Sequence, residues 1–335
     1  MAESSVILEI INLKKYYPVT EGIFKKVTGY VRAVDDVSLR VHEGETLGIV
    51  GESGCGKTTL GKCLVRLHKP SGGELRIRFE DIGLTDLFSL GQADSFKARR
   101  RVQMVFQDPY SSLNPMKNIL TAFDEPLKIH GFGDKATRRE IIAEALRTVN
   151  LQPDYMYRYP HEFSGGQRQR ICIAKALALK PEVVVCDEPV SALDVSIQAQ
   201  ILNLMKSLQK MLNLTYVFIA HDLSVVEYMS DRVAVMYLGK VVELADAEEL
   251  YSNRAHPYTE ALLSAVPIPV LGARKDRILL KGDVPSPFNP PSGCRFHPRC
   301  SKIIKNSNIC SEVEPVLKPI GEAGKHFTAC HLCGV

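Results

Sequence analysis

Residues 51 to 59 read GESGCGKTT and combine the residue types and spacing of a phosphate-binding loop. They fit the pattern G-x-x-x-x-G-K-[ST], in which glycines let backbone N–H groups face phosphates at the start of a helix. Lys57 is expected to reach the β- and γ-phosphates of a nucleotide, and the Thr58 hydroxyl to ligate Mg²⁺. Residues 45–50 have the pattern of a strand and residues 59–67 that of a helix, which disfavours a chance Gly-rich turn.

Two adjacent acids end a second apolar segment, EVVVCDEP, at residues 182–189. A continuous apolar run is typical of a strand buried in a parallel sheet. Asp187 is placed to hold Mg²⁺, whereas Glu188 faces the other way along the strand and could polarise an attacking water. The alternative is a pair of solvated acids in a turn. It is disfavoured because the two acids lie downstream of a phosphate-binding loop.

Two further polar residues follow predicted strands. Gln107 ends the strand predicted at 102–106, and His221 follows the strand predicted at 215–220. Open α/β sheets bind ligands outside the carboxyl ends of their strands. Gln107 could therefore reach the metal or the attacking water, and His221 falls on the same edge. A plain turn residue and a structural histidine are the alternatives.

The sequence FSGGQRQR at 163–170 opens a helix predicted to continue through residues 171–179. Ser164 is a good N-cap, and Gly165 and Gly166 expose backbone N–H groups at the positive end of the helix. The segment is therefore a second anion site, separate from the first. A capped turn without a ligand is the alternative.

The remaining pattern predicts an α/β chain. Strands are expected at 6–13 and 33–41, helices at 141–149 and 196–212, and a β-hairpin at 233–244. Between the first two strands lies a basic and aromatic segment, residues 14–30, which we expect to be a loop. Its tyrosines, Tyr16 and Tyr17, could stack on an adenine ring or pack on the sheet, and the sequence does not separate these alternatives.

Composition limits the class of protein. The chain has 335 residues, enough for two or three domains, and its 45% hydrophobic and 24% charged residues are ordinary for a globular protein. A net charge of +4 is too small to imply nucleic acid. The longest charge-free run has 13 residues, whereas a membrane-spanning helix needs about 20. The first ten residues lack the basic region of a secretory signal, so we expect a cytosolic protein.

The residues from about 253 onward are rich in proline and cysteine. In a reducing compartment, clustered cysteines suggest a metal site more than disulfides. Zinc is one candidate, with the C-x-x-C spacing at 330–333 supplying a familiar pair of ligands. Ordinary packing is the other reading. Five of the nine cysteines lie in the last 42 residues: Cys294, Cys300, Cys310, Cys330 and Cys333.

Taken in order, these motifs and the SALD sequence at 191–194 resemble the ATP-binding subunit of ABC transporters over about residues 5–250. The HPY sequence at 256–258 and GCRFHPRC at 293–300 resemble the C-terminal region of the oligopeptide/dipeptide importer branch. Phe163 stands where the family usually has leucine, which keeps the position apolar. The resemblance implies a RecA-like P-loop core with an inserted helical subdomain. It divides the chain into an ABC ATPase domain, residues 1–255, with helices inserted at about 108–180, and a Cys- and Pro-rich tail domain, residues 256–335.

The resemblance also implies roles for single residues. Glu188 would activate water, His221 would sense the γ-phosphate, and Gln107 would contact Mg²⁺ together with Thr58 and Asp187. Tyr17 would stack on adenine, and the segment that begins at Ser164 would close over the ATP of an opposite protomer. The implied ATP-binding residues are Tyr17, Gly51, Ser53, Gly54, Cys55, Gly56, Lys57, Thr58, Thr59, Ser164, Gly165, Gly166, Gln167 and Asp194.

The implied function is ATP hydrolysis that drives uptake of di- and oligopeptides. The implied partners are a second ATP-binding subunit, two transmembrane permeases and, indirectly, an extracytoplasmic peptide-binding protein, with the chain on the cytoplasmic face of the membrane. Members of this branch often carry a [4Fe–4S] cluster, and the matching positions are Cys294, Cys300, Cys310 and Cys330, which leaves Cys333 spare. A soluble ABC ATPase acting on nucleic acid would usually have coiled-coil insertions or two cassettes, and an exporter would not explain the tail.

Overall fold

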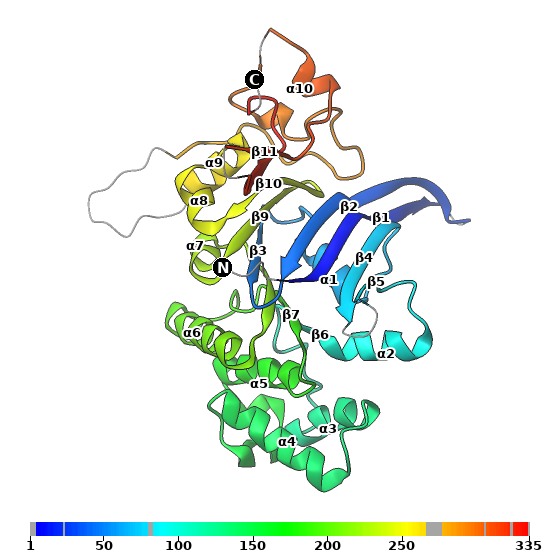
Figure 1. The fold of residues 1–335 in the computed structure, drawn as a ribbon, viewed down its shortest axis with the longest axis vertical. Helices are drawn as coiled ribbons and strands as arrows, with labels where there is room; N and C mark the ends of the chain where they lie inside the picture. Colours follow the sequence, from blue (N-terminus) through cyan, green and yellow to red (C-terminus); the bar gives the residue numbers. More distant parts are fainter. Residues whose placement is uncertain are drawn as a thin grey trace.

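The computed structural model describes residues 5–22, 24–79, 83–265, 277–304, 306–321 and 324–333. The molecule is elongated, with a helical region at one end and the residues after 277 at the other (Figure 1). The sheet that carries the phosphate-binding loop lies between these two ends.

The central sheet is mixed. Among the described residues its strand order is β11-β12-β10-β9-β3-β8-β7-β6. Strands β9, β3, β8, β7 and β6 run parallel to one another, whereas β10, β12 and β11 continue the sheet in antiparallel fashion. Every residue of β3, β7 and β8 is buried, which explains why these sequences are apolar without alternation. The bounds are β3 Thr46–Val50, β6 Val102–Val105, β7 Val183–Asp187, β8 Thr215–Ile219, β9 Arg232–Tyr237, β10 Lys240–Asp246, β11 Lys318–Ile320 and β12 His326–Thr328.

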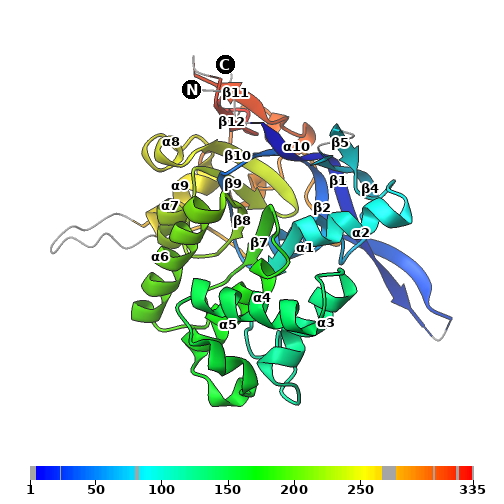
Figure 2. The same ribbon diagram turned by 60° about the horizontal axis from the view of Figure 1, so that its bottom comes forward.

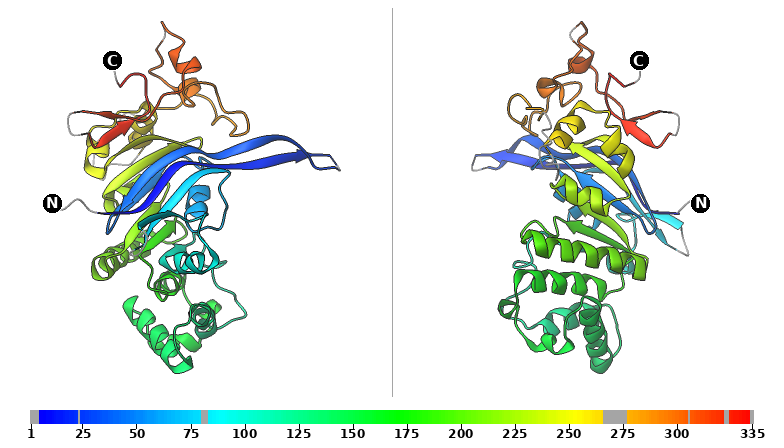
Figure 3. Two further views of the ribbon diagram at one scale, coloured as in Figure 1. Left: turned by 45° about the vertical axis from the view of Figure 1, so that its right-hand side comes forward. Right: turned by 90° about the vertical axis from the view of Figure 1, so that its left-hand side faces the viewer.

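A second, antiparallel sheet has the strand order β2-β1-β4-β5. Its first two strands correct the prediction of a loop at 14–30, because they continue through this segment as one long ribbon that projects from the molecule (Figure 3). Backbone pairing across the ribbon supplies its hydrogen bonds, so the ribbon can extend beyond the apolar core, and most residues near its tip are exposed. The bounds are β1 Val6–Glu21, β2 Lys26–His42, β4 Gly72–Phe79 and β5 Gly83–Asp86.

Hydrophobic clusters cover both faces of the central sheet, and β7 shows the division. Val183 and Val185 belong to the cluster that packs between the two sheets together with helix α1. Val184 and Cys186 belong to the cluster on the other face, which holds the helices of the lower half of the molecule (Figure 2). Successive residues of a strand point to opposite faces, so a strand enclosed by two clusters must be apolar throughout.

Helices are inserted between β6 and β7. Their N-caps are local: the side chains of Asn118, Asp134 and Ser164 each accept a hydrogen bond from the backbone N–H three residues on. The prediction that Ser164 caps a helix is therefore confirmed. The helices up to residue 252 are α1 Lys57–Leu64, α2 Gln92–Arg101, α3 Ile119–Ile129, α4 Lys135–Thr148, η1 Pro153–Tyr157, η2 Pro160–Glu162, α5 Gly165–Leu177, α6 Val195–Leu212, α7 Leu223–Met229 and α8 Ala247–Ser252.

The residues from His256 onward, here called the C-terminal extension, join the central sheet. Strand β12 pairs with β10, with Thr328 opposite Glu243 and Phe327 opposite Leu244. The predicted division of the chain at residue 255 therefore falls within one continuous sheet, to which the extension adds two strands. Its other elements are α9 Pro257–Ser264, η3 His297–Arg299 and α10 Ile309–Glu312.

A fully buried carboxylate holds the extension to the core. Glu243 on β10 accepts hydrogen bonds from the backbone N–H groups of Ala255 at 2.7 Å and His256 at 3.0 Å. His326 Nε2 lies 2.7 Å from the same carboxylate. Burial by itself lowers the pKa of His326, but Glu243 and Glu249 outweigh this effect, and the pKa is raised above its ordinary value.

We predict that stability falls with rising pH because of this pair. A histidine whose pKa is raised on folding contributes fully below its unfolded pKa, about 6.5, and loses that contribution as pH rises through the folded value. Between about pH 6 and pH 9, the melting temperature of the wild type should drop more than that of His326→Gln. His161→Gln, at an exposed position, is the control and should follow the wild type. Parallel pH profiles for wild type and His326→Gln would contradict the assignment.

Candidate nucleotide site

The phosphate-binding loop joins β3 to α1, which begins at Lys57. Lys57 Nζ donates to the carbonyl oxygens of Gly51 at 2.7 Å and Glu52 at 3.1 Å, so the ammonium lies over the loop. Gly51 and Gly56 have φ of 153° and 108°. A Cβ at Gly56 would lie 2.0 Å from the Ala33 carbonyl oxygen, so only glycine fits there. Ser53 and Gly54 form the exposed tip of the loop, whereas Cys55 is buried.

The predicted magnesium ligands meet at the edge of the sheet. Thr58 Oγ1 donates to Asp187 Oδ1 at 2.9 Å. Asp187 is 3% exposed, and burial raises the pKa of its carboxyl although Thr58 and two nearby lysines lower it. A hydroxyl and a carboxylate at the end of a strand are hard oxygen ligands, and a divalent cation bound to them would favour the charged carboxylate. Thr59, the next residue, is half-buried in the first turn of α1.

Three predicted catalytic side chains converge from three strand ends. Gln107 Nε2 donates to Glu188 Oε2 at 2.8 Å, and His221 Nδ1 lies 3.0 Å from the same oxygen. They follow β6, β7 and β8, which are parallel neighbours and so end at one edge. Glu188 has φ of 47°, and its N–H donates to the Ile219 carbonyl at 2.8 Å. A left-handed backbone at a non-glycine residue is typical of functional sites.

The segment predicted as a second anion site lies at the start of α5. Ser164 and Gln167 cap each other reciprocally, with each side chain accepting the other's backbone N–H. A Cβ on Gly166 would lie 2.6 Å from Ile197 of α6, so α5 and α6 touch closely there. Among the described residues, no hydrogen bond or ion pair joins residues 163–167 to the phosphate-binding loop.

Asp194 is the N-cap residue of α6, and its side chain is exposed. Its backbone carbonyl accepts hydrogen bonds from Ile197 and Gln198, so the carboxylate is not used in capping. The side chain of Leu193, one residue earlier, lies 3.4 Å from the Cβ position of Gly165. The SALD turn and the glycine pair therefore lie side by side, and the roles of Asp194, Gly165 and Gly166 in ATP binding stay predictions.

The two tyrosines of the first ribbon differ in their contacts. Tyr16 donates its hydroxyl to Asp35, and burial followed by this hydrogen bond raises the pKa of Tyr16 to about 12. The Tyr17 ring lies edge-on to His68 at 5.8 Å and under the Lys15 ammonium at 5.0 Å. The Tyr16 side chain is thus held by a hydrogen bond within the protein, and the role of Tyr17 in stacking on adenine stays a prediction.

Sequence reasoning missed two residues that contact the phosphate-binding loop. Tyr258 Oη accepts the N–H of Glu52 at 2.8 Å, and Arg299 donates to the Glu52 carboxylate at 2.7 and 3.1 Å. Both belong to the C-terminal extension. Tyr258 lies in the HPY sequence and Arg299 in GCRFHPRC, so both motifs could be recognised. Nothing in the spacing of these motifs indicates that they reach the loop.

Four cysteines of the extension line one small cavity together with His256, Phe296 and neighbouring side chains: Cys294, Cys300, Cys310 and Cys330. Cys333 does not line this cavity; its thiol donates to the Ala255 carbonyl at 3.5 Å and contacts the thiol of Cys330. Burial, reinforced by the other thiols, raises the pKa of Cys294 to about 11. In the described parts of the chain, no three His, Cys, Asp or Glu side chains are arranged to hold a single metal ion.

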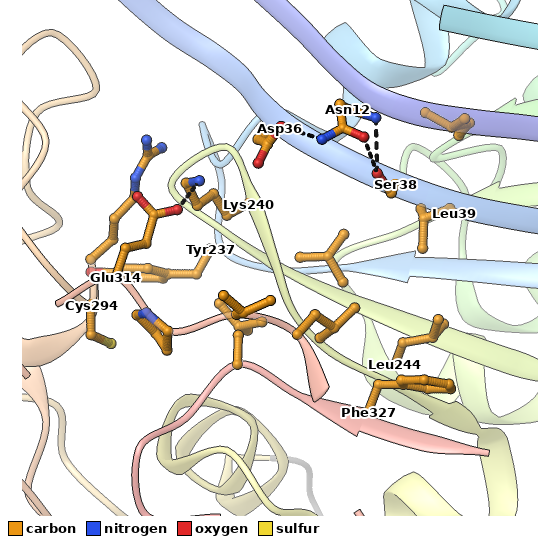
Figure 4. Close-up of a pocket in the computed structure, with 18 of the residues that line it drawn as sticks. Asn12, Asp36, Ser38, Leu39, Tyr237, Lys240, Leu244, Cys294, Glu314 and Phe327 are labelled. Atoms are coloured by element: carbon orange, nitrogen blue, oxygen red, sulfur yellow. Dashed lines mark hydrogen bonds and ion pairs between the residues drawn. The ribbon is translucent and has the colours of Figure 1, made fainter. Parts of the chain in front are cut away.

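A cavity of about 640 Å³ lies elsewhere, between the β1–β2 ribbon, the β9–β10 hairpin and the extension (Figure 4). Its floor includes Leu39, Leu244 and Phe327, and the ion pair between Lys240 and Glu314 lies at one side. No residue of the phosphate-binding loop lines it. The predicted nucleotide-binding residues lie instead at the edge of the central sheet, where Glu188 and His221 line a small hollow.

This fold and site define a P-loop ATPase of the ABC class. A family model described as "ABC transporter" matches residues 34–191, and one described as "Oligopeptide/dipeptide transporter, C-terminal region" matches residues 242–306. The chain is 51% identical to the oligopeptide transport ATP-binding protein AppF of Bacillus subtilis, over 99% of this chain and 98% of that protein. It is 49% identical to the dipeptide transport ATP-binding protein DppF of Escherichia coli, over 94% and 92%.

Among solved structures, the chain resembles a dimeric post-hydrolysis state of the ATP-binding cassette MJ0796 bound to ADP and Pi. The TM-score is 0.60 at 29% identity, covering 72% of this chain and 99% of that one. The chain therefore belongs to the family of ATP-binding subunits of oligopeptide/dipeptide ABC transporters, and it is an ABC transporter ATPase. In the part of the chain that the structure describes, no helix is both long and apolar enough to cross a membrane.

We predict that Glu188→Gln lowers ATP turnover by about 10²–10⁴-fold, the usual range for a general base, while ATP binding is retained. The amide can still meet Gln107 and His221 but cannot take a proton from water. Turnover and equilibrium binding of a fluorescent ATP analogue measure the two effects separately. Lys57→Ala should instead lose affinity for the ATP analogue. The matched control is Glu227→Gln, at an exposed position on α7. Near-normal turnover of Glu188→Gln would refute its role.

Proposed function

We propose that this chain hydrolyses ATP to drive import of di- and oligopeptides through membrane partners. The observation that carries the proposal is the convergence of Gln107, Glu188 and His221 beside the Thr58–Asp187 pair. Nearly full-length similarity to oligopeptide and dipeptide transport ATP-binding proteins supports peptides as the transported substrate.

In this proposal ATP binds between two subunits arranged head to tail. The segment from Ser164 to Gln167 begins α5 and, among the described residues, makes no hydrogen bond or ion pair to the phosphate-binding loop. A second subunit would present its own copy of this segment to the γ-phosphate bound here. The relatives of known structure include dimeric cassettes, which supports this arrangement.

Each side chain then has its own role in the reaction. Lys57 would bind the phosphates, Tyr17 would support the adenine, and Thr58 and Asp187 would hold Mg²⁺ with the help of Gln107. Glu188 accepts a proton from the attacking water, and the contact with His221 fixes the direction of its carboxylate. Mg²⁺ supplies charge neutralisation between the β- and γ-phosphates. Loss of the γ-phosphate weakens the contact between subunits, and their separation drives the permeases.

The proposed partners follow from the same assignment. They are a second ATP-binding subunit, which is a copy or a homologue, two transmembrane permeases, and an extracytoplasmic peptide-binding protein that acts through the permeases. The chain itself would sit at the cytoplasmic face of the membrane as a peripheral subunit. No nucleic acid is required, in keeping with the net charge of +4.

We predict that vesicles containing the chain and its permeases take up di- and tripeptides only with ATP inside and the binding protein outside. The Glu188→Gln complex is the matched control and should show no uptake, because the subunits close on ATP but do not reset. Radiolabelled peptide uptake is the measurement, with a free amino acid and a nickel salt as competing substrates. Uptake of one of these in place of peptides would overturn the peptide assignment and leave the ATPase intact.

We propose further that Cys294, Cys300, Cys310 and Cys330 hold a [4Fe–4S] cluster. Their placement around one cavity supports a single shared group. A single ion such as zinc is less well supported, because no three of the described ligands converge on one point. Thiolates hold such clusters generally, and four iron–thiolate bonds would cross-link segments of the extension that have little regular structure.

We predict iron and acid-labile sulfide in protein purified without air, at about four irons per chain. Visible absorption and metal analysis are the measurements. Cys300→Ser should lose iron and colour, whereas Cys333→Ser, outside the proposed set of ligands, should keep both. One zinc per chain, or no metal in the wild type, would refute the cluster. Loss of iron in Cys333→Ser and not in Cys300→Ser would refute this choice of ligands.

A further inference from the structure

Glu52, the second residue of the phosphate-binding loop, is held at two points by the C-terminal extension. Its backbone N–H donates to Tyr258 Oη at 2.8 Å, and its carboxylate accepts from both terminal nitrogens of Arg299, at 2.7 and 3.1 Å. These partners are 206 and 247 residues away along the chain. A guanidinium that meets a carboxylate through two parallel bonds fixes distance and direction together.

The two holding side chains are themselves fixed. Tyr258 is fully buried, and its ring packs 4.7 Å from that of Tyr237 and 5.4 Å from that of Phe296. Arg299 is 8% exposed, and its guanidinium also donates to the Tyr237 hydroxyl at 3.5 Å. The hydrogen bond to Glu52 raises the pKa of Arg299, so the guanidinium stays charged. Buried aromatic packing therefore sets where the positive charge meets the loop.

Glu52 is directly connected to the residue that binds phosphate. Its carbonyl oxygen accepts from Lys57 Nζ at 3.1 Å and from the Cys55 N–H at 3.2 Å. A shift of Glu52 would therefore shift the turn of the loop and the position of the ammonium. An acidic residue in a loop that binds a triphosphate also repels its ligand unless a positive charge offsets it.

We propose that Arg299 and Tyr258 are positioning residues of the nucleotide site. Arg299 offsets the charge of Glu52 and, with Tyr258, holds the first turn of the loop in the shape that receives ATP. The C-terminal extension is thereby part of the ATP-binding apparatus, in addition to any metal that it holds. These roles of Arg299 and Tyr258 do not depend on a metal cluster, because all the contacts involved are hydrogen bonds and packing within the protein.

The test is equilibrium binding of a fluorescent ATP analogue with Mg²⁺ to the full-length chain. Arg299→Ala leaves a partly buried carboxylate unpaired and should weaken binding about ten-fold. The double variant Arg299→Ala with Glu52→Gln removes the unpaired charge and should regain most of that loss. Tyr258→Phe keeps the ring but loses the acceptor for the Glu52 N–H, and should weaken binding by a smaller factor.

Lys325→Ala is the matched control, because it also removes one positive charge from the extension but lies near Asp246, away from the loop. Wild-type affinity in Arg299→Ala would overturn the proposal. So would a double variant that binds no better than Arg299→Ala, since a purely structural role of Arg299 would not respond to the charge of Glu52. If Arg299→Ala does not fold, Arg299→Gln, which fills more of the space, replaces it with the same expectations and the same partner variant.

Discussion

The parallel register of the central strands is the constraint on which the site depends. Ile219 on β8 lies opposite Ile49 on β3 and opposite Asp187 on β7. The phosphate-binding loop begins two residues after Ile49, so one backbone position aligns the loop with the acid that ends the buried strand. The contact between Thr58 and Asp187 is a consequence of this alignment. Strands that ran antiparallel would place these ends on opposite edges of the sheet.

Buried and half-buried charge is the second organising feature, and several of these groups lie where the extension meets the core. Glu243 is surrounded by two backbone N–H groups and His326, Asp35 by Tyr16 and Arg295, and Glu52 by Arg299. A buried carboxylate without partners is costly, so each acid requires its donors to be present. These pairs add little net stability compared with apolar packing. Instead they specify one arrangement of the extension against the core.

Within one chain, the residues of the proposed reaction lie in two separate places. The acids, Gln107 and His221 stand at one edge of the sheet, whereas the Ser164 segment belongs to the helical region, where α5 packs against α6. In the proposed head-to-tail dimer, a site shared between two chains would make hydrolysis depend on association of the subunits. The same division would make the separation of the subunits available as mechanical work on a membrane partner.

Local patterns determined much of this protein from sequence alone. The loop at 51–59, the acids at the end of β7, the N-cap Ser164 and the hairpin at 233–244 all follow from residues close together in the chain, where spacing and backbone preference suffice. Tertiary structure alone decided that residues 14–30 form a ribbon, that four distant cysteines line one cavity, and that Arg299 and Tyr258 reach Glu52. Those contacts join segments separated by up to 247 residues, and they depend on how strands and buried rings pack, which no local spacing encodes.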